Sequence, residues 1–166
     1  MAWDMHTEGL TEVSEMLGRL GDRAQDVAVG ALFDGAGIVA DAFSKAANSI
    51  ATEPFHYLAK PELTGTKRYP SPEEKAAVVG KTGIAAFRKN GSEVDTVVGI
   101  TGKAGYVNIN GKQKAVRLIA RSIESGTSFM HKQPVFRRAV NSTKGAAKEA
   151  IVGKAEEMFE KIINGD

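Results

Sequence analysis

The stretch SIESGTSFMHKQPVFRRAV, residues 122–140, sets how the last part of this chain folds. A strand-like run ends in Glu-Ser-Gly-Thr, a short loop follows, and an apolar-periodic helix begins at Phe136. A glycine here supplies backbone conformations that other residues resist, and a threonine can hydrogen-bond the turn. We interpret the junction as a structural corner that aims the last helix. Its residues are Glu124, Gly126, Thr127, Pro134 and Phe136.

Outward from this corner, helical periodicity predicts long helices at both ends of the chain. Residues 135–163 place apolar side chains on one helical face, and residues 9–20 do the same. Gly21-Asp22 then predicts an interruption, after which a longer helical pattern runs through residues 27–43. The glycines inside this second pattern let another backbone come close, either within one subunit or from a neighbouring subunit. They are Gly30, Gly35 and Gly37.

Residues 51–72 hold four of the five prolines and predict a long loop. Its aromatic side chains form a possible partner-docking loop, because a loop of about twenty residues is unusual unless it is functional or disordered. They are Phe55, His56, Tyr57 and Tyr69. Ser71 then predicts a helix N-cap, with Pro72 at the first helical position, and this helix is expected to end near residue 87 or 88.

Turn signals divide the next segment into strands. Asn90-Gly91 precedes EVDTVVGIT, whose alternation predicts one strand, and Asn110-Gly111 predicts a hairpin leading into the strand that ends at Glu124. The expected fold class is α+β, with a small antiparallel β-sheet packed against long N-terminal and C-terminal helices. We expect residues 1–166 to form a single domain.

Composition narrows the functional classes only slightly. The net charge is +2, but residues 1–101 carry 10 Lys and Arg against 14 Asp and Glu, whereas residues 102–166 carry 12 against 6. The basic half is compatible with DNA contact, a solvated helix or one side of a contact between subunits. The chain has no cysteine, its first residues lack a signal-peptide pattern, and no run approaches the roughly 18 apolar residues of a membrane span. We therefore expect no membrane partner.

The search for chemistry predicts no catalytic, cofactor-binding or metal-binding residue. His6, His56 and His131 are far apart and lack the spacing of a zinc site. The glycine-rich segment 99–105 lacks the first glycine and the Ser or Thr of a phosphate loop. Glu124 could serve as a general base only with a nearby titratable partner, so we favour a role in capping the loop or in pairing with an arginine.

The corner residues carry a resemblance to a family. Residues 120–127, ARSIESGT, followed by QPVFRRA at 133–139, resemble the hallmark of head–tail joining or tail-completion proteins of long-tailed bacteriophages and prophages. In that family a strand ends in Glu-aromatic-Gly-Thr and a loop leads through Pro-Phe to a long C-terminal helix. Here Ser125 stands in place of the aromatic residue, and Val135 separates Pro134 from Phe136.

The resemblance implies a virion structural protein, not an enzyme, that acts without a cofactor. Such proteins form a homo-oligomeric ring, commonly sixfold, at the head-proximal end of the tail, where they meet the tail-tube protein and the connector or neck proteins of the head. The protein would be located in the neck or tail of the virion, and in the host cytoplasm during assembly. Alternatives are another minor tail or head-completion protein, a DNA-contacting neck protein, and a small hydrolase using Glu124 and His131.

Overall fold

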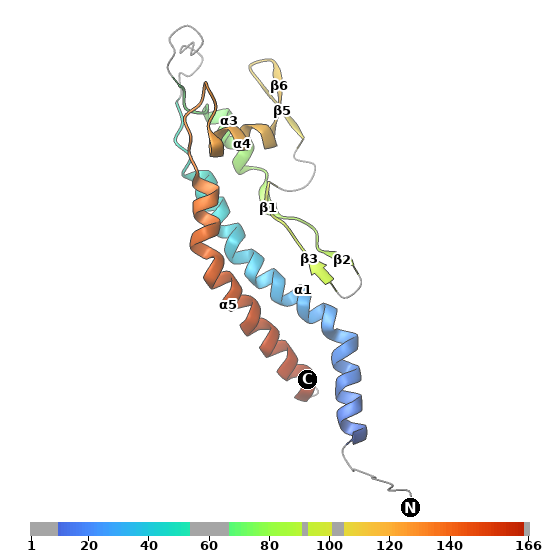
Figure 1. Ribbon diagram of the computed structural model, residues 1–166. Coiled ribbons are helices and arrows are strands. Elements are labelled where there is room, and N and C mark those ends of the chain that lie inside the picture. The colour runs from blue at the N-terminus through green and yellow to red at the C-terminus, as the bar shows by residue number, and fades with distance from the viewer. Residues whose placement is uncertain (1–9, 54–66, 91–92, 101–104, 165–166) are drawn as a thin grey trace, which may run out of the picture.

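Two long helices lying side by side dominate the structure, a computed structural model that describes residues 10–53, 67–90, 93–100 and 105–164. Helix α1 spans Leu10–Asn48 and helix α5 spans Val135–Asn164. They run antiparallel, and the smaller elements gather at one end of the pair and along α1 (Figure 1). We call the α1–α5 pair the stalk. The head is the group of smaller elements at its upper end, residues 49–53, 67–81 and 105–134.

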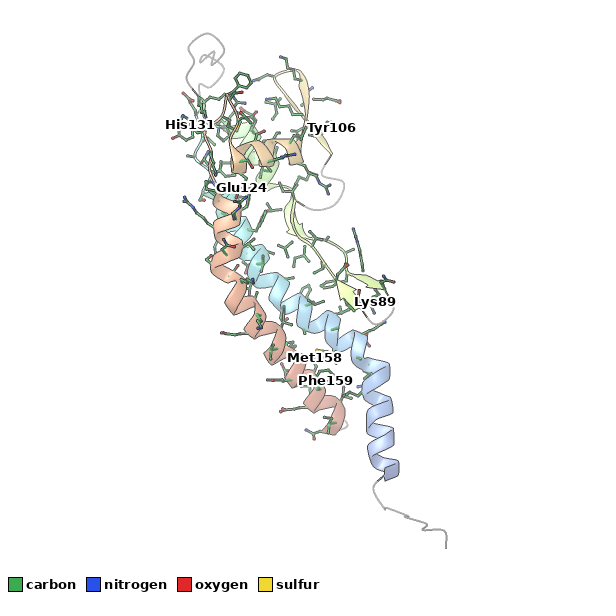
Figure 2. All side chains as sticks on the ribbon, viewed as in Figure 1. Lys89, Tyr106, Glu124, His131, Met158 and Phe159 are labelled. Carbon is green, nitrogen blue, oxygen red and sulfur yellow. The ribbon has the colours of Figure 1, made fainter. Side chains whose placement is uncertain are left out.

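Close packing of α1 against α5 explains two of the three glycines. A Cβ atom on Gly30 would lie 2.7 Å from Sδ of Met158, and one on Gly35 would meet the side chain of Ile151. Figure 2 shows Met158 where α5 faces α1. The glycines therefore serve contacts within one chain, which was one of the two predicted possibilities. Gly37 has no such neighbour within 4 Å among the described residues.

Helix α1 is continuous from Leu10 to Asn48, so the interruption predicted at Gly21-Asp22 is wrong. An isolated glycine costs only about 1 kcal/mol in a helix, and tertiary context often outweighs that preference. Helix α5, expected to begin at Phe136, begins one residue earlier, at Val135 directly after Pro134. Both long terminal helices expected from periodicity are present.

Helix α3, Pro72–Val79, begins as predicted and ends earlier than predicted. The Ser71 hydroxyl accepts a hydrogen bond from the Glu74 N–H, and the Glu74 carboxylate accepts one from the Ser71 N–H, which completes a capping box. The helix stops at Gly80 instead of residue 87 or 88, because the chain turns there into strand β1, Thr82–Ile84.

The described strands form three antiparallel pairs, so the α+β class is confirmed while the expected sheet is divided into small parts. Strand β1 pairs with β4, Val98–Ile100, and β2, Arg88–Asn90, pairs with β3, Glu93–Asp95. The single strand predicted from EVDTVVGIT is therefore two short strands. Between them, Ala85 N–H donates to the Val97 carbonyl and Thr96 Oγ1 donates to the Ala85 carbonyl. These bonds join the two pairs into one long interrupted hairpin.

The third pair is the hairpin predicted at Asn110-Gly111. Strand β5, Tyr106–Ile109, pairs with β6, Lys112–Ala115. Asn110 has φ 53° and Gly111 has φ 75°, the two positive values that a two-residue type I′ turn requires. This hairpin projects from the head (Figure 1).

Helix α4, Val116–Ser125, corrects the sequence analysis, which predicted a strand ending at Glu124. Its buried side chains recur at i, i+3, i+4 and i+7 and all lie on one face of a helix, whereas a strand would divide them between two faces. They are Val116, Ile119, Ala120 and Ile123. The helix buries this face in the head core, together with Ile50, Val78, Met130 and Phe136.

Part of α1 is apolar enough to cross a membrane by length and composition alone. Residues Arg23–Asn48 reach a mean hydropathy of 1.5 over 18 residues, so the statement that no run approaches a membrane span is wrong by this measure. Alanine, valine, leucine, isoleucine and phenylalanine residues raise this mean. The same composition is found in helices that pack inside a protein, and α1 packs against α5, α3, β1, β3 and β4. This helix is therefore weak evidence for a membrane segment.

Candidate interaction site: the corner and the head pocket

Glu124 holds the start of α5 from the last turn of α4. Its two carboxylate oxygens accept hydrogen bonds from the backbone N–H groups of Phe136 and Arg137, each at 3.0 Å. These N–H groups have no partner within α5 itself, and a negative charge at a helix N-terminus is favourable. Glu124 is thus a capping residue supplied by a neighbouring helix (Figure 2).

The turn between the two helices uses the residues that sequence analysis singled out. Gly126 has φ 71°, and a Cβ atom there would lie 3.0 Å from Cβ of Lys132 and 3.1 Å from its backbone nitrogen. Thr127 Oγ1 accepts hydrogen bonds from the N–H groups of Phe129 and Met130, at 3.1 and 3.0 Å. The turn therefore depends on a glycine for its conformation and on a threonine for its hydrogen bonds.

Phe136 and Gln133 tie the corner to the end of α1. Phe136 is buried, and its ring stacks on Phe43 with centroids 4.3 Å apart. The Gln133 amide pairs with the backbone of Ala51, accepting from its N–H at 2.9 Å and donating to its carbonyl at 3.1 Å. Sequence reasoning missed Gln133, since nothing in its local pattern shows a partner 82 residues away.

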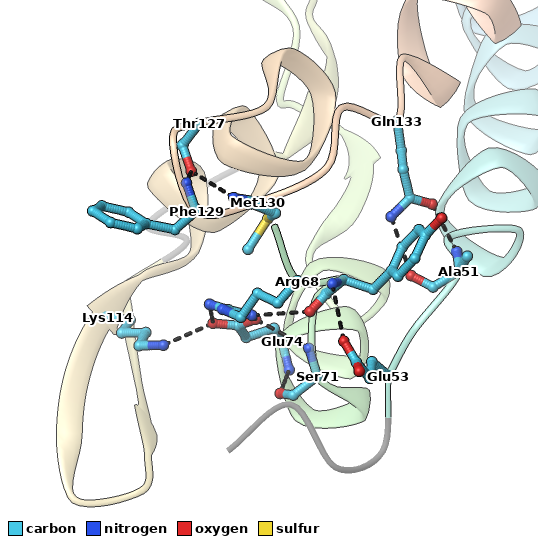
Figure 3. A network of polar contacts seen from close by, with 11 residues as sticks. Ala51, Glu53, Arg68, Ser71, Glu74, Lys114, Thr127, Phe129, Met130 and Gln133 are labelled. Atoms are coloured by element: carbon cyan, nitrogen blue, oxygen red, sulfur yellow. Dashed lines mark hydrogen bonds and ion pairs between the residues drawn. The ribbon is translucent and has the colours of Figure 1, made fainter. Parts of the chain in front are cut away.

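A second polar cluster lies in the head around Glu74, whose side chain is 2% exposed (Figure 3). Its carboxylate accepts from both terminal nitrogens of Arg68, at 2.8 and 3.1 Å, and from Nζ of Lys114 at 2.7 Å. Burial disfavours the charged form, but the hydrogen bonds from Arg68, Lys114 and the Ser71 N–H outweigh it and lower the pKa of Glu74 to about 2. The sequence predicted Glu74 only as part of a helix start.

This cluster forms one wall of an open pocket of about 390 Å³, which we call the head pocket. Its apolar floor includes Ala115, Ile119 and Met130. Two large side chains stand at its rim, Tyr106 at 71% exposed and Leu118 at 62% exposed. Large exposed apolar groups beside a charged cluster are typical of a contact surface for another protein.

The predicted docking loop is described only in part. Phe55, His56 and Tyr57 lie outside the described residues. Tyr69 is exposed, and its ring stacks on His131 with centroids 4.7 Å apart. The preceding residue, Arg68, forms a parallel bridge to Met130, so the end of this segment is joined to the corner.

The two residues that a hydrolase would require are engaged in other contacts. Both oxygens of Glu124 face backbone N–H groups, and the His131 ring lies against Tyr69. Within the described ranges, no group of three or more His, Cys, Asp or Glu side chains is arranged to hold a metal ion. In the described structure, Glu124 therefore serves as a helix cap and the His131 ring takes part in a ring stack.

No protein-family profile, curated protein or solved structure matches this chain.

Proposed function

We propose that this protein is a structural assembly protein of the neck or tail of a long-tailed bacteriophage or prophage. It forms a homo-oligomeric ring, sixfold in the commonest arrangement of such proteins, that completes the head-proximal end of the tail. The ring binds the tail-tube protein on one side and the connector or neck proteins of the phage head on the other. It resides in the virion and is assembled in the host cytoplasm.

The corner is the observation that carries this proposal. The residues that resemble the phage family, from Glu124 to Phe136, are those whose contacts set the start of a 30-residue helix. The product is an elongated stalk with a small head, and large apolar side chains stay exposed in both. Such a shape suits a subunit that packs beside copies of itself more than an enzyme that encloses a substrate.

The test is removal of the chain from a phage or prophage that encodes it. Electron microscopy of lysates should then show DNA-filled phage heads separate from tails, and tails of uncontrolled length. Supplying the wild-type chain from a plasmid should restore joined particles. Normal joined virions without the chain would overturn the proposal.

One observation favours DNA contact as a second candidate function. The described residues of the head carry 9 Lys and Arg against 4 Asp and Glu, a net charge of +5. Packaged DNA is a polyanion and passes through the neck of the phage, where the basic head of this protein could contact it. Duplex binding by the purified protein, with an affinity that falls steeply as salt rises, would support this role. Unchanged affinity across salt concentrations, or no binding, would exclude it.

A further inference from the structure

The outer face of α5 carries a stripe that the stalk itself does not use. Its residues follow the spacing i, i+3, i+7, i+11 and i+14, so they share one helical face. They are Glu149, Val152, Glu156, Glu160 and Ile163, which we call the outer stripe. The contacts with α1 come from Ala147, Ile151 and Met158, on the opposite side of the helix. The outer stripe therefore points away from the stalk.

The outer stripe combines exposed apolar groups with acids that have no partner in the described part of the chain. Val152 is 46% exposed and Ile163 is 45% exposed. The neighbouring Glu157 differs, because hydrogen bonds from Lys161 and Lys154 hold it and lower its pKa to about 2. Among the described side chains, the stripe acids have no such ion pair.

The charge order along α5 is the reverse of what helix stability favours. Residues 135–148 carry four basic side chains and no acid, whereas residues 149–164 carry four acids and two lysines. A helix is stabilised by acids near its N-terminus and bases near its C-terminus. The stability of α5 therefore does not explain this order of charges. A partner that binds the acidic end of α5 would explain it.

The head presents the complementary surface. Tyr106 and Leu118 are its exposed apolar groups, and Lys114 and Arg121 are its cations, with Arg121 one turn along α4 from Leu118. We call these four residues the head face. It is basic and apolar where the outer stripe is acidic and apolar. The outer stripe is about 21 Å long along the axis of α5. Helix α4 is about 15 Å long, and the β5–β6 hairpin lies beside it, so the two surfaces are of similar length.

We propose that the outer stripe of one copy docks on the head face of a second copy. This inference rests on the proposed ring and names the surfaces that close it. The stripe belongs to the far end of the stalk and the head face to the head, so the contact joins two different surfaces. Such a heterologous contact repeats from copy to copy and closes a ring when the rotation permits. Opposite charges align the two surfaces and apolar groups fill the contact.

Changes of charge on the outer stripe, and on the head face together with the adjacent Gln113 of the head pocket, test the pairing. The stripe variant is Glu156→Lys/Glu160→Lys, and the head variant is Gln113→Glu/Arg121→Glu, all at exposed positions. Both variants keep Lys114, because its side chain forms an ion pair with the buried Glu74. The matched control is Asp41→Lys/Glu93→Lys, which makes the same change in net charge as the stripe variant at exposed positions elsewhere. Circular dichroism checks that each variant is folded.

The measurement is solution mass across protein concentrations. Each variant alone should need at least about tenfold more protein to assemble than the wild type and the control. An equal mixture of the two variants should restore assembly, since a basic stripe meets an acidic head face and the unaltered surfaces also meet. Variants that assemble like the wild type, or a mixture that restores nothing, would overturn this pairing alone. A wild-type protein that assembles neither alone nor with the tail-tube protein would overturn the proposed ring as well.

Discussion

The head and the stalk are stabilised by different kinds of contact. The head combines an apolar core with directional polar contacts, such as the four hydrogen bonds to the buried Glu74 carboxylate and the two backbone donors on Glu124. The stalk depends on the close approach of two helices where Gly30 and Gly35 lack side chains. Polar contacts fix a precise geometry in the head, whereas the stalk needs only one face of α5. The opposite face, which carries Val152 and Ile163, stays exposed.

The largest effect is expected where head and stalk meet. Phe136→Ala removes a buried ring that stacks on Phe43, so the free energy of unfolding should fall by about 3–5 kcal/mol. Phe129→Ala is the matched control, since that ring is half exposed and should cost less than about 1 kcal/mol. Urea unfolding of both variants measures the difference. Equal losses would show that the junction is not built on the Phe43–Phe136 contact.

A smaller effect, specific to the head, is expected from Glu74→Gln. Near neutral pH this variant should lose about 2–3 kcal/mol, because two cations lose a charged partner. The folded pKa of about 2 lies below the ordinary value of 4.5. The stabilisation by Glu74 is therefore complete above about pH 4.5 and is lost as the pH falls towards 2.

The stability difference between wild type and Glu74→Gln should accordingly shrink from pH 5 to pH 2, as thermal unfolding in a pH series would show. Other carboxylates titrate in this range in both proteins, so the comparison isolates Glu74. A difference that stays constant over the series would contradict the assigned network.

In the stalk, two glycines of one helix should respond in opposite directions. Gly35→Ala places a Cβ against Ile151 and 3.0 Å from the Ala147 carbonyl oxygen, so it should destabilise by about 1–2 kcal/mol. Gly37→Ala meets nothing within 4 Å and should stabilise by about 0.5–1 kcal/mol through helix propensity. Melting temperatures of the pair test this. Two shifts of the same sign would mean that α1 and α5 do not pack as described.

The smallest effect is expected at the corner, from Glu124→Gln. The amide oxygen can replace only one of the two hydrogen bonds to the start of α5, and the charge at the helix N-terminus is lost, which should cost about 1 kcal/mol. Hydrogen exchange at Phe136 and Arg137 should speed up, while exchange in the middle of α5 should not. Unchanged exchange at these two amides would contradict the capping role.

Sequence reasoning predicted the stalk better than the head. The apolar periodicity of a long helix is visible in its own sequence, so α5 was placed within a residue of its observed ends. Helix α4 was taken as a strand because the preceding hairpin and the corner resemblance both favoured one, although Val116, Ile119 and Ile123 follow helical spacing.

The site was predictable where it depended on local chemistry. Gly126, Thr127 and the capping box at Ser71 follow from backbone conformations and short-range hydrogen bonds. Lys114 lies 40 residues from Glu74, and Ala51 lies 82 residues from Gln133, so no local pattern indicates these two partners.

Solution mass tests the central claim of a ring-forming assembly protein most directly. It should be measured for the purified protein alone and after mixing with the tail-tube protein of the same phage. The account predicts a closed assembly in at least one condition, at about 106 kDa for six chains of 17.6 kDa, or as an added mass of that size on the tube. A species of 17.6 kDa in both conditions, at every concentration, would contradict it.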